Sequence, residues 1–265
     1  MKIGIIYKEE DAIVAGTAKK VMAELAAAGH KAINITKNHA LKGIDFIITF
    51  GGDGTILRAA RITAKNKIPL LTAHLGGLGI LSEISHLEII GSVELVKSKK
   101  YHLDSRMMLD AGVIRNGKKI KSTPALNDIV IGKSSIARTI KLEAFLKDKS
   151  IASYIGDGLI ISTATGSTAY NFAVNGPILP PDSKSFILSP ICPHRGANRS
   201  IILEDSINIK IVKGEDLLLT ADGQETFYLK KGDVITIGKS EYKTNFIRLK
   251  EYNIWELLKN KLGWI

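Results

Sequence analysis

Two kinds of hydrophobic pattern follow one another along the chain, and the change falls near residue 100. In the first part, short apolar runs alternate with stretches in which apolar residues recur every three or four positions, the spacing of an amphipathic helix. The runs predict strands over 2–7, 31–35, 45–50 and 69–73, and the helical spacing predicts a helix that Gly29 closes and two more near 56–64 and 87–98. Strands that alternate with helices predict a parallel, doubly wound sheet.

After residue 100 the apolar runs are shorter and turn residues separate them. They predict strands over 103–114, 126–131, 140–146, 158–162, 207–212, 217–220, 234–237 and 246–249. Asn116-Gly117 is typical of a two-residue hairpin turn. Five of the seven prolines fall between Pro177 and Pro193, where we expect extended connections and no regular structure.

These patterns predict an α/β chain with two domains. A doubly wound parallel sheet is expected over 1–100 and a mostly-β domain over 101–250. Residues 253–262 have helical spacing, and we expect this helix to pack back on the first domain because one of its faces is apolar. That face carries Ile254, Leu257, Leu258 and Leu262.

Composition narrows the class of protein. With 265 residues, 45% of them hydrophobic and 24% charged, the chain is typical of a soluble globular protein, and no apolar run approaches the roughly 20 residues that span a bilayer. The N-terminus shows no signal-peptide cleavage site, so a cytoplasmic location without membrane contact is expected. A single cysteine, Cys192, excludes an intramolecular disulfide. The net charge of +11 suits an anionic partner, but the scattered lysines lack interleaved aromatic residues, which disfavours nucleic acid.

The sequence Gly51-Gly52-Asp53-Gly54-Thr55 follows a predicted buried strand and precedes a predicted helix. Glycines let the backbone approach a ligand closely, and a helix N-terminus offers N–H groups to an anion, so this loop indicates a phosphate site. Asp53 is unusual there, because a carboxylate repels phosphates unless it holds a cation or removes a proton. The alternative is a tight turn in which Asp53 only caps the helix.

A second unusual segment, 156–170, is rich in glycine and in hydroxyl side chains and ends at Tyr170. Small hydroxyls, exposed N–H groups and one tyrosine would suit a sugar and a purine ring. Alternatively, Ser167 or Thr168 merely starts a short helix. No G-x-G-x-x-G motif occurs in the chain, which disfavours an ordinary Rossmann dinucleotide site.

Six segments in one order resemble the NAD kinase family. They are 51–55, 74–80, Asn127-Asp128, 162–170, 190–194 and Asp222-Gly223-Gln224. The glycine-aspartate loop is shared with lipid kinases, whereas Thr-Gly-Ser-Thr-Ala-Tyr at 165–170 is far more specific. The resemblance implies an NAD kinase that phosphorylates the 2′-hydroxyl of the adenosine ribose of NAD. It also implies that the second domain is a β-sandwich.

The resemblance assigns roles to matching positions. Asp53 is expected to be the catalytic base, and Gly51, Gly52, Gly54 and Thr55 are expected to cradle the donor phosphates, with Gly54 also lining the NAD site. Asn127 and Asp128 match the pair that holds the nicotinamide-side ribose. Thr168, Ala169 and Tyr170 match residues that line the adenine, and Asp157 matches a carboxylate near the nicotinamide end.

Three single positions and one run depart from the family pattern; the run is Val174-Asn175-Gly176-Pro177, which replaces a more glycine-rich one. Asp128 stands where glutamate is usual, so its carboxylate reaches about one methylene less far; Ile80 and Ala164 stand where phenylalanine and proline are common. ATP is the expected donor, with inorganic polyphosphate as a second one, and Mg²⁺ is expected to bind through the donor phosphates and Asp53. A homodimer or homotetramer is also expected.

Other functions remain open from the residues alone. A lipid kinase would share the Asp53 loop but need an apolar entry for acyl chains. A non-catalytic dinucleotide sensor would keep the binding residues without the chemistry.

Overall fold

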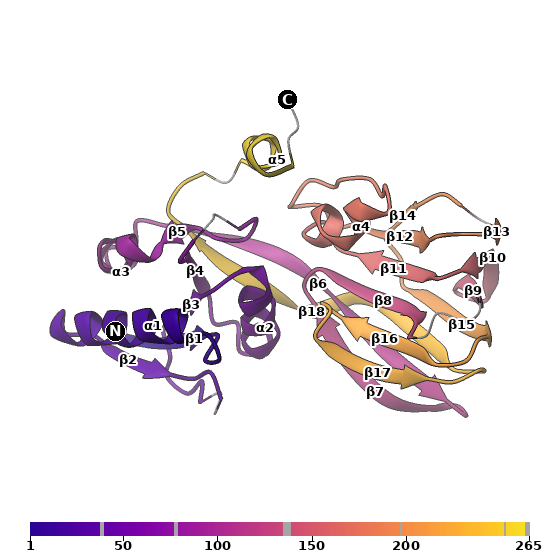
Figure 1. The fold of residues 1–265 in the computed structure, drawn as a ribbon, viewed down its shortest axis with the longest axis horizontal. Helices are drawn as coiled ribbons and strands as arrows, with labels where there is room; N and C mark the ends of the chain where they lie inside the picture. Colours follow the sequence, from indigo (N-terminus) through magenta and orange to yellow (C-terminus); the bar gives the residue numbers. More distant parts are fainter. Residues whose placement is uncertain (38–39, 77–78, 135–138, 197, 252, 263–265) are drawn as a thin grey trace. The chain divides into compact units, whose positions relative to one another are not determined.

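The computed structural model describes residues 1–37, 40–76, 79–134, 139–196, 198–251 and 253–262 (Figure 1). Contacts between Cα atoms divide the chain into two compact units. Unit 1 consists of Met1–Arg106 and Tyr242–Ile265, and unit 2 consists of Met107–Glu241. The chain passes from unit 1 to unit 2 within strand β6 (His102–Arg115) and returns within strand β18 (Val234–Arg248).

Unit 1 is built on a parallel sheet. Its strands are β1 (Lys2–Tyr7), β2 (Lys31–Asn34), β3 (Phe46–Phe50), β4 (Leu70–His74), β5 (Ile84–Ser85) and the end of β18. The strand order is β18-β4-β3-β1-β2, with β5 beside β4. Tyr7 pairs with Phe50, and Phe50 pairs with Ala73, so the carboxyl ends of β1, β3 and β4 meet at one edge.

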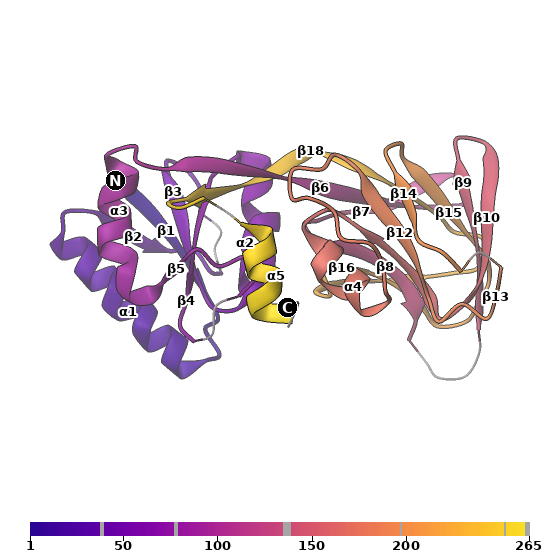
Figure 2. The same cartoon turned by 90° about the horizontal axis from the view of Figure 1, so that it is seen from above.

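Helices cover both faces of this sheet, as the doubly wound prediction requires (Figure 2). Helices α1 (Ala12–Ala27) and α3 (Ile89–Lys97) share one core cluster with the side chains of one sheet face, including Ile5, Ile48 and Leu71. Helix α2 (Asp53–Thr63) packs against β1, β3 and β4 outside that cluster. A helix on each side explains why β3 is buried at all five of its positions.

Unit 2 is a sandwich of two mainly antiparallel sheets. One sheet has the order β14-β12-β11-β8-β16-β17; the other runs β13-β10-β9-β15-β18, with β6 pairing both β18 and β7. Alternate residues of the two sheets, such as Ile131 and Ile161 in one and Leu142 and Ile209 in the other, share one core. The α/β and β-sandwich fold class is therefore confirmed. The remaining strands are β7 (Lys118–Ala125), β8 (Asp128–Lys133), β9 (Ile140–Leu146), β10 (Lys149–Gly156), β11 (Gly158–Ser162), β12 (Phe186–Ile191), β13 (Arg195–Gly196), β14 (Ile201–Leu203), β15 (Ile207–Lys213), β16 (Leu217–Ala221) and β17 (Glu225–Leu229).

The hairpin prediction is confirmed at Asn116 and Gly117, which both have positive φ, 51° and 75°. Two other predictions are wrong. The segments 234–237 and 246–249 belong largely to one strand, β18. The prediction failed because the middle of β18 is polar and alternately exposed, so that it resembles a connection. Strand β12 lies in the proline-rich stretch expected to be irregular. Its Pro190 is tolerated because β14 pairs only with residues Phe186 to Leu188 of β12, which leaves one side of the strand unpaired beyond them.

The C-terminal helix, α5 (Ile254–Leu262), groups with unit 1. Leu258 is buried, at 2% exposure. The side chains of Leu257 and Leu262, two of the four predicted apolar contacts, lie outside the described part of the chain.

Candidate functional site

The glycine loop lies at the carboxyl edge of the unit 1 sheet, between β3 and α2. Gly51 has φ +142°, and a Cβ there would lie 2.6 Å from Oγ1 of Thr55, so only glycine fits without strain. Gly52 is the N-cap of α2, and a Cβ on it would meet no atom of the described residues within 4 Å. The first turn of α2 therefore borders open space at its positive end, which suits an anion.

Asp53 is the first residue of α2, and its carboxylate does not cap the helix. Thr55 N–H donates to the carbonyl oxygen of Gly52 (2.9 Å), whereas the Asp53 carboxylate accepts from two amides of another loop. Ile80 N–H donates to Oδ2 (3.2 Å) and Leu81 N–H to Oδ1 (3.3 Å). The capping alternative is thus wrong, and the carboxylate is held in one orientation.

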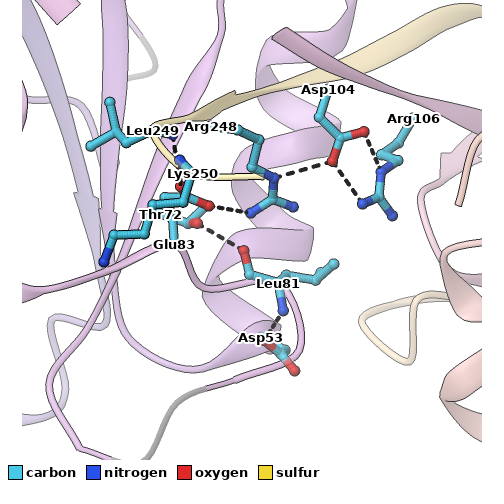
Figure 3. A network of polar contacts seen from close by, with 9 residues as sticks. All are labelled: Asp53, Thr72, Leu81, Glu83, Asp104, Arg106, Arg248, Leu249 and Lys250. Atoms are coloured by element: carbon cyan, nitrogen blue, oxygen red, sulfur yellow. Dashed lines mark hydrogen bonds and ion pairs between the residues drawn. The ribbon is translucent and has the colours of Figure 1, made fainter. Parts of the chain in front are cut away.

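The loop that holds Asp53 follows β4 and is itself fixed. A Cβ on Gly79 would lie 2.4 Å from Oδ1 of Asp53, so the loop formed by segment 74–80 needs a glycine at this point. Figure 3 shows Leu81 between Asp53 and Thr72, whose hydroxyl donates to the Leu81 carbonyl oxygen (2.8 Å). Residues 77 and 78 of the predicted motif lie outside the described residues.

In unit 2, Asn127 and Asp128 lie where the chain enters β8. Asp222 accepts hydrogen bonds from three consecutive amides, those of Leu126 (3.1 Å), Asn127 (2.7 Å) and Asp128 (3.3 Å). These bonds fix the backbone of the predicted pair. Within the described part of the chain, Oδ1 of Asn127 is buried without a hydrogen-bond partner, so it can accept a bond from a ligand.

Asp128 is a buried carboxyl group, 6% exposed. Burial, and secondarily the negative charge of Asp222, raises the pKa of Asp128 to about 7. The group therefore titrates near neutral pH, where it can donate or accept a proton in a hydrogen bond with a hydroxyl group.

The segment 162–170 wraps around Asn127. The Thr163 hydroxyl donates to the Leu126 carbonyl oxygen (2.6 Å), and the Thr163 N–H donates to the Asn127 carbonyl oxygen (2.9 Å). A Cβ on Gly166 would lie 2.1 Å from the Asn127 carbonyl oxygen, so the two backbones meet at a glycine. The hydroxyl groups of this segment thus organise the backbone around Asn127.

Thr168, Ala169 and Tyr170 end this segment. Thr168 is buried, whereas Tyr170 is 45% exposed at the start of the short helix α4 (Tyr170–Ala173). The N-cap of α4 is Ala169, without a side-chain capping bond, so Ser167 and Thr168 do not start this helix as caps. An exposed ring beside a buried hydroxyl is suited to packing against a ligand ring.

Asp157 is separated from these residues. It precedes β11, which pairs Ser162 with Asp128 at one end and Gly158 with Gly132 at the other. At the rise of a strand this places Asp157 about 15 Å from Asp128 along the sheet. Asp157 pairs instead with Lys133, whose Nζ lies 2.7 Å from Oδ1.

The structure also assigns roles to residues that the sequence did not single out. Asp222 belongs to the segment Asp222-Gly223-Gln224, and the local feature that marks it is the Asp-Gly pair. Asp222 (φ 51°) and Gly223 (φ 63°) form the turn between β16 and β17. Nothing in the local sequence pointed to Glu83 or Arg248, whose partners are distant along the chain.

A carboxylate fixed among glycines at a helix N-terminus is suited to phosphoryl transfer, in which positioning and charge matter most. Comparison with known proteins agrees. Residues 3–101 match the ATP-NAD kinase N-terminal domain, and residues 126–249 match the ATP-NAD kinase C-terminal domain. The chain belongs to the NAD kinase family.

Individual relatives support this membership. The NAD kinase of Geobacter sulfurreducens is 37% identical, with 99% of this chain and 98% of that protein covered. That of Caldanaerobacter subterraneus subsp. tengcongensis is 41% identical, with 82% of this chain and 78% of the relative covered.

Solved structures resemble the chain over its whole length. An NAD kinase from Archaeoglobus fulgidus in complex with ATP has a TM-score of 0.79 and 26% identity, with 100% of both chains covered. Yeast NADH kinase complexed with NADH has a TM-score of 0.89, with 100% of this chain and 88% of that chain covered; at 22% identity it supports the fold alone. Because the chain belongs to this family, it is an NAD kinase, and the lipid kinase and the sensor without activity are excluded as alternatives. No helix among the described residues is long and apolar enough to cross a membrane.

Proposed function

We propose that this chain transfers the terminal phosphoryl group of ATP to the 2′-hydroxyl of the adenosine ribose of NAD, with Asp53 as the base. The observation that carries the proposal is the Asp53 carboxylate, which two amides hold beside the open N-terminus of α2. Asp53 takes the hydroxyl proton, the ribose oxygen bonds to the terminal phosphorus, and the bond from that phosphorus to ADP breaks. The products are NADP and ADP.

Each unit has its own part in this reaction. Gly51, Gly52, Gly54 and Thr55 of unit 1 bind the donor phosphates through backbone groups. In unit 2, Oδ1 of Asn127 accepts a hydrogen bond from a ribose hydroxyl of NAD, and Asp128 is its partner on the same ribose. The adenine ring packs at Thr168, Ala169 and Tyr170. Asp157 contacts NAD near its nicotinamide end. Because Asp157 is separated from Asp128 along the sheet, the two carboxyl groups do not contact the same ribose.

Mg²⁺ is part of the proposal, and the residues fit it as a substrate-bound ion. Among the described residues no group of three His, Cys, Asp or Glu side chains could hold a metal. Mg²⁺ is commonly bound by one carboxylate together with substrate phosphates and water, and Asp53 beside the glycine loop supplies that carboxylate. The ion would neutralise charge on the transferring phosphoryl group.

The test is NADP formation by the purified chain with ATP or with inorganic polyphosphate, each with and without EDTA. We expect NADP with ATP, lost on addition of EDTA and restored by excess Mg²⁺. Polyphosphate is proposed as a second donor, because a glycine loop binds a phosphate chain of either origin. Activity that persists in EDTA would contradict the metal assignment, and absence of NADP with both donors would contradict the proposed reaction.

A cytoplasmic homo-oligomer, dimer or tetramer, completes the proposal. Support comes from the outer strands of the six-stranded sheet, where Ile202 of β14 and Tyr228 of β17 are 52% and 71% exposed. Apolar side chains on unpaired strand edges favour association. Light scattering would measure the mass, and a monomer at working concentration would contradict this part.

A further inference from the structure

A continuous set of polar contacts links Asp53 to Arg248 and Asp104 within unit 1 (Figure 3). Leu81, which donates to Asp53, accepts from the Thr72 hydroxyl, and Glu83 N–H donates to the Thr72 carbonyl oxygen (2.9 Å). The segment from Ile80 to Glu83 is therefore fixed on β4 at two points, both supplied by Thr72. This residue is 1% exposed.

The Glu83 carboxylate extends the contacts to the last residues of β18 and beyond. It accepts from Arg248 Nη1 (2.9 Å), from Leu249 N–H (2.7 Å) and from Lys250 N–H (3.3 Å). Nε of Arg248, whose side chain is fully buried, donates to Asp104 (3.1 Å), which also receives two bonds from Arg106. Burial alone would raise the pKa of Asp104, but the hydrogen bonds and charges of Arg106 and Arg248 hold that pKa below its usual value.

We propose that Thr72 and Glu83 are positioning residues that aim the Ile80 and Leu81 amides at Asp53, and that they act on the reaction only through Asp53. This inference rests on the proposed role of Asp53 as the base. The physical reason is that the Asp53 carboxylate is oriented by two backbone donors, and the segment carrying those donors is anchored by Thr72 and Glu83. A base displaced by about 1 Å from its substrate can lose on the order of a hundredfold in rate.

The chain offers a matched control for Thr72. Thr49 lies on the neighbouring strand β3, pairs directly with Thr72, and is 0% exposed. In the described part of the chain its hydroxyl has no hydrogen-bond partner. Thr72→Val and Thr49→Val are the same chemical change at adjacent buried positions, but only the first removes a bond to the segment that holds Asp53.

We expect Thr72→Val to lower kcat by about tenfold or more while KM for ATP and for NAD stays within about twofold, since the substrate contacts are untouched. Thr49→Val should leave kcat unchanged, and Thr72→Ser, which keeps the hydroxyl, should restore it. Glu83→Gln removes the charge that Arg248 faces and should lower kcat in the same way. Its control is Asp233→Asn in unit 2, which breaks a pair with Arg115 (2.7 Å) and should lower the melting temperature without affecting kcat. The Asp233 carboxylate is buried as Glu83 is, although the Arg115 side chain is 26% exposed.

The deciding measurement is a double-mutant cycle with Asp53→Asn. If Thr72 and Glu83 act through Asp53, Thr72→Val and Glu83→Gln cause no further loss of kcat in the Asp53→Asn background. Equal losses in both backgrounds, or a Thr72→Val enzyme with normal kcat, would overturn the positioning role while leaving the proposed function intact. Full activity of Asp53→Asn itself would overturn both. Should Glu83→Gln fail to fold, the threonine variants complete the test.

Discussion

Replacing Asp53 by asparagine tests the chemistry most directly, and the structure predicts two separate effects. Asparagine keeps the size of the side chain but loses the negative charge and the basic oxygen. Without a base on the 2′-hydroxyl, kcat should fall by about 10² to 10⁴, the usual contribution of a positioned general base. NAD binding should change little, because the proposed NAD contacts other than Gly54 all lie in unit 2.

The second effect is on stability, and it follows from the two amides that meet the carboxylate. Asparagine has one carbonyl oxygen and one NH₂ group, so either Ile80 N–H or Leu81 N–H must face a donor. An unsatisfied donor costs about 1–3 kcal/mol, and the lost charge at the start of α2 costs about 0.3–1 kcal/mol more. Because both bonds are only partly buried, the low end of the first range applies, which still gives a fall of several degrees in the melting temperature.

The assay follows NADP formation with ATP, NAD binding by calorimetry and thermal unfolding, all on one preparation of each protein. Unfolding must begin well above the assay temperature, so that the loss of kcat is separated from the loss of stability. A variant with normal kcat would refute the base mechanism. A variant with an unchanged melting temperature would instead show that the two amides are not paired with Asp53 in solution.

Two further predictions concern the glycine loop and Asp128. Gly51→Ala should destabilise the chain by roughly 1–3 kcal/mol, because φ is +142° and the new Cβ would meet Thr55. Gly52→Ala should leave the melting temperature nearly unchanged, because its methyl group meets no described residue, and should raise KM for ATP if the donor phosphates occupy that space as proposed. The raised pKa of Asp128, about 7, means that the folded chain keeps a proton that the unfolded chain has lost, so stability falls as pH rises from about 4 to about 7. Asp128→Asn removes this dependence. Urea unfolding should give the Asp128→Asn variant a free energy of unfolding higher than that of the wild type by at most about 4 kcal/mol near pH 8, and by clearly less near pH 5.

Each of these outcomes has a counterpart that would contradict it. Loss of folding in Gly52→Ala would mean that the space beside the helix N-terminus is filled by the protein itself. A stability difference between Asp128→Asn and wild type that does not change with pH would mean that Asp128 titrates at its ordinary pKa.

The sequence predicted the fold well where local pattern decides it. The apolar runs of unit 1 predict strands β1 to β4 within one residue at either end. For β1, β3 and β4 the reason is that a parallel strand buried on both faces leaves a continuous apolar run, whereas the edge strand β2 is only partly buried. Strands β9 and β11 were predicted at their observed bounds. The pattern failed at β12, where prolines conceal a strand paired on one side only, and at β18, whose exposed middle resembles a connection.

The candidate site was predicted in part. The glycine loop and Asp53 are local in sequence, so their place at a helix N-terminus could be foreseen. The partners of Asp53 could not be foreseen, because Ile80 and Leu81 lie 27 and 28 residues further along the chain. They contribute only backbone amides, which nearly every residue type has, so the sequence does not indicate them. Asp222 holds the 126–128 backbone from 94 to 96 residues away, a distance that no motif spacing encodes.

The division of unit 1 between two separate stretches of chain fixes an order of events during synthesis. The ribosome delivers residues 1–106 first, but the strand that pairs Phe246 with Leu70 and carries Arg248 follows only after all of unit 2. At the usual rate of translation this delay is on the order of ten seconds. During that time the Leu70 end of one edge of β4 lacks its partner strand, although β5 already pairs with Ala73 and His74 on that edge. Glu83 also lacks the three donors, on Arg248, Leu249 and Lys250, from which its carboxylate accepts hydrogen bonds. Since an unpaired strand edge can join another chain, the nascent N-terminal stretch is the part of this protein most in need of a chaperone.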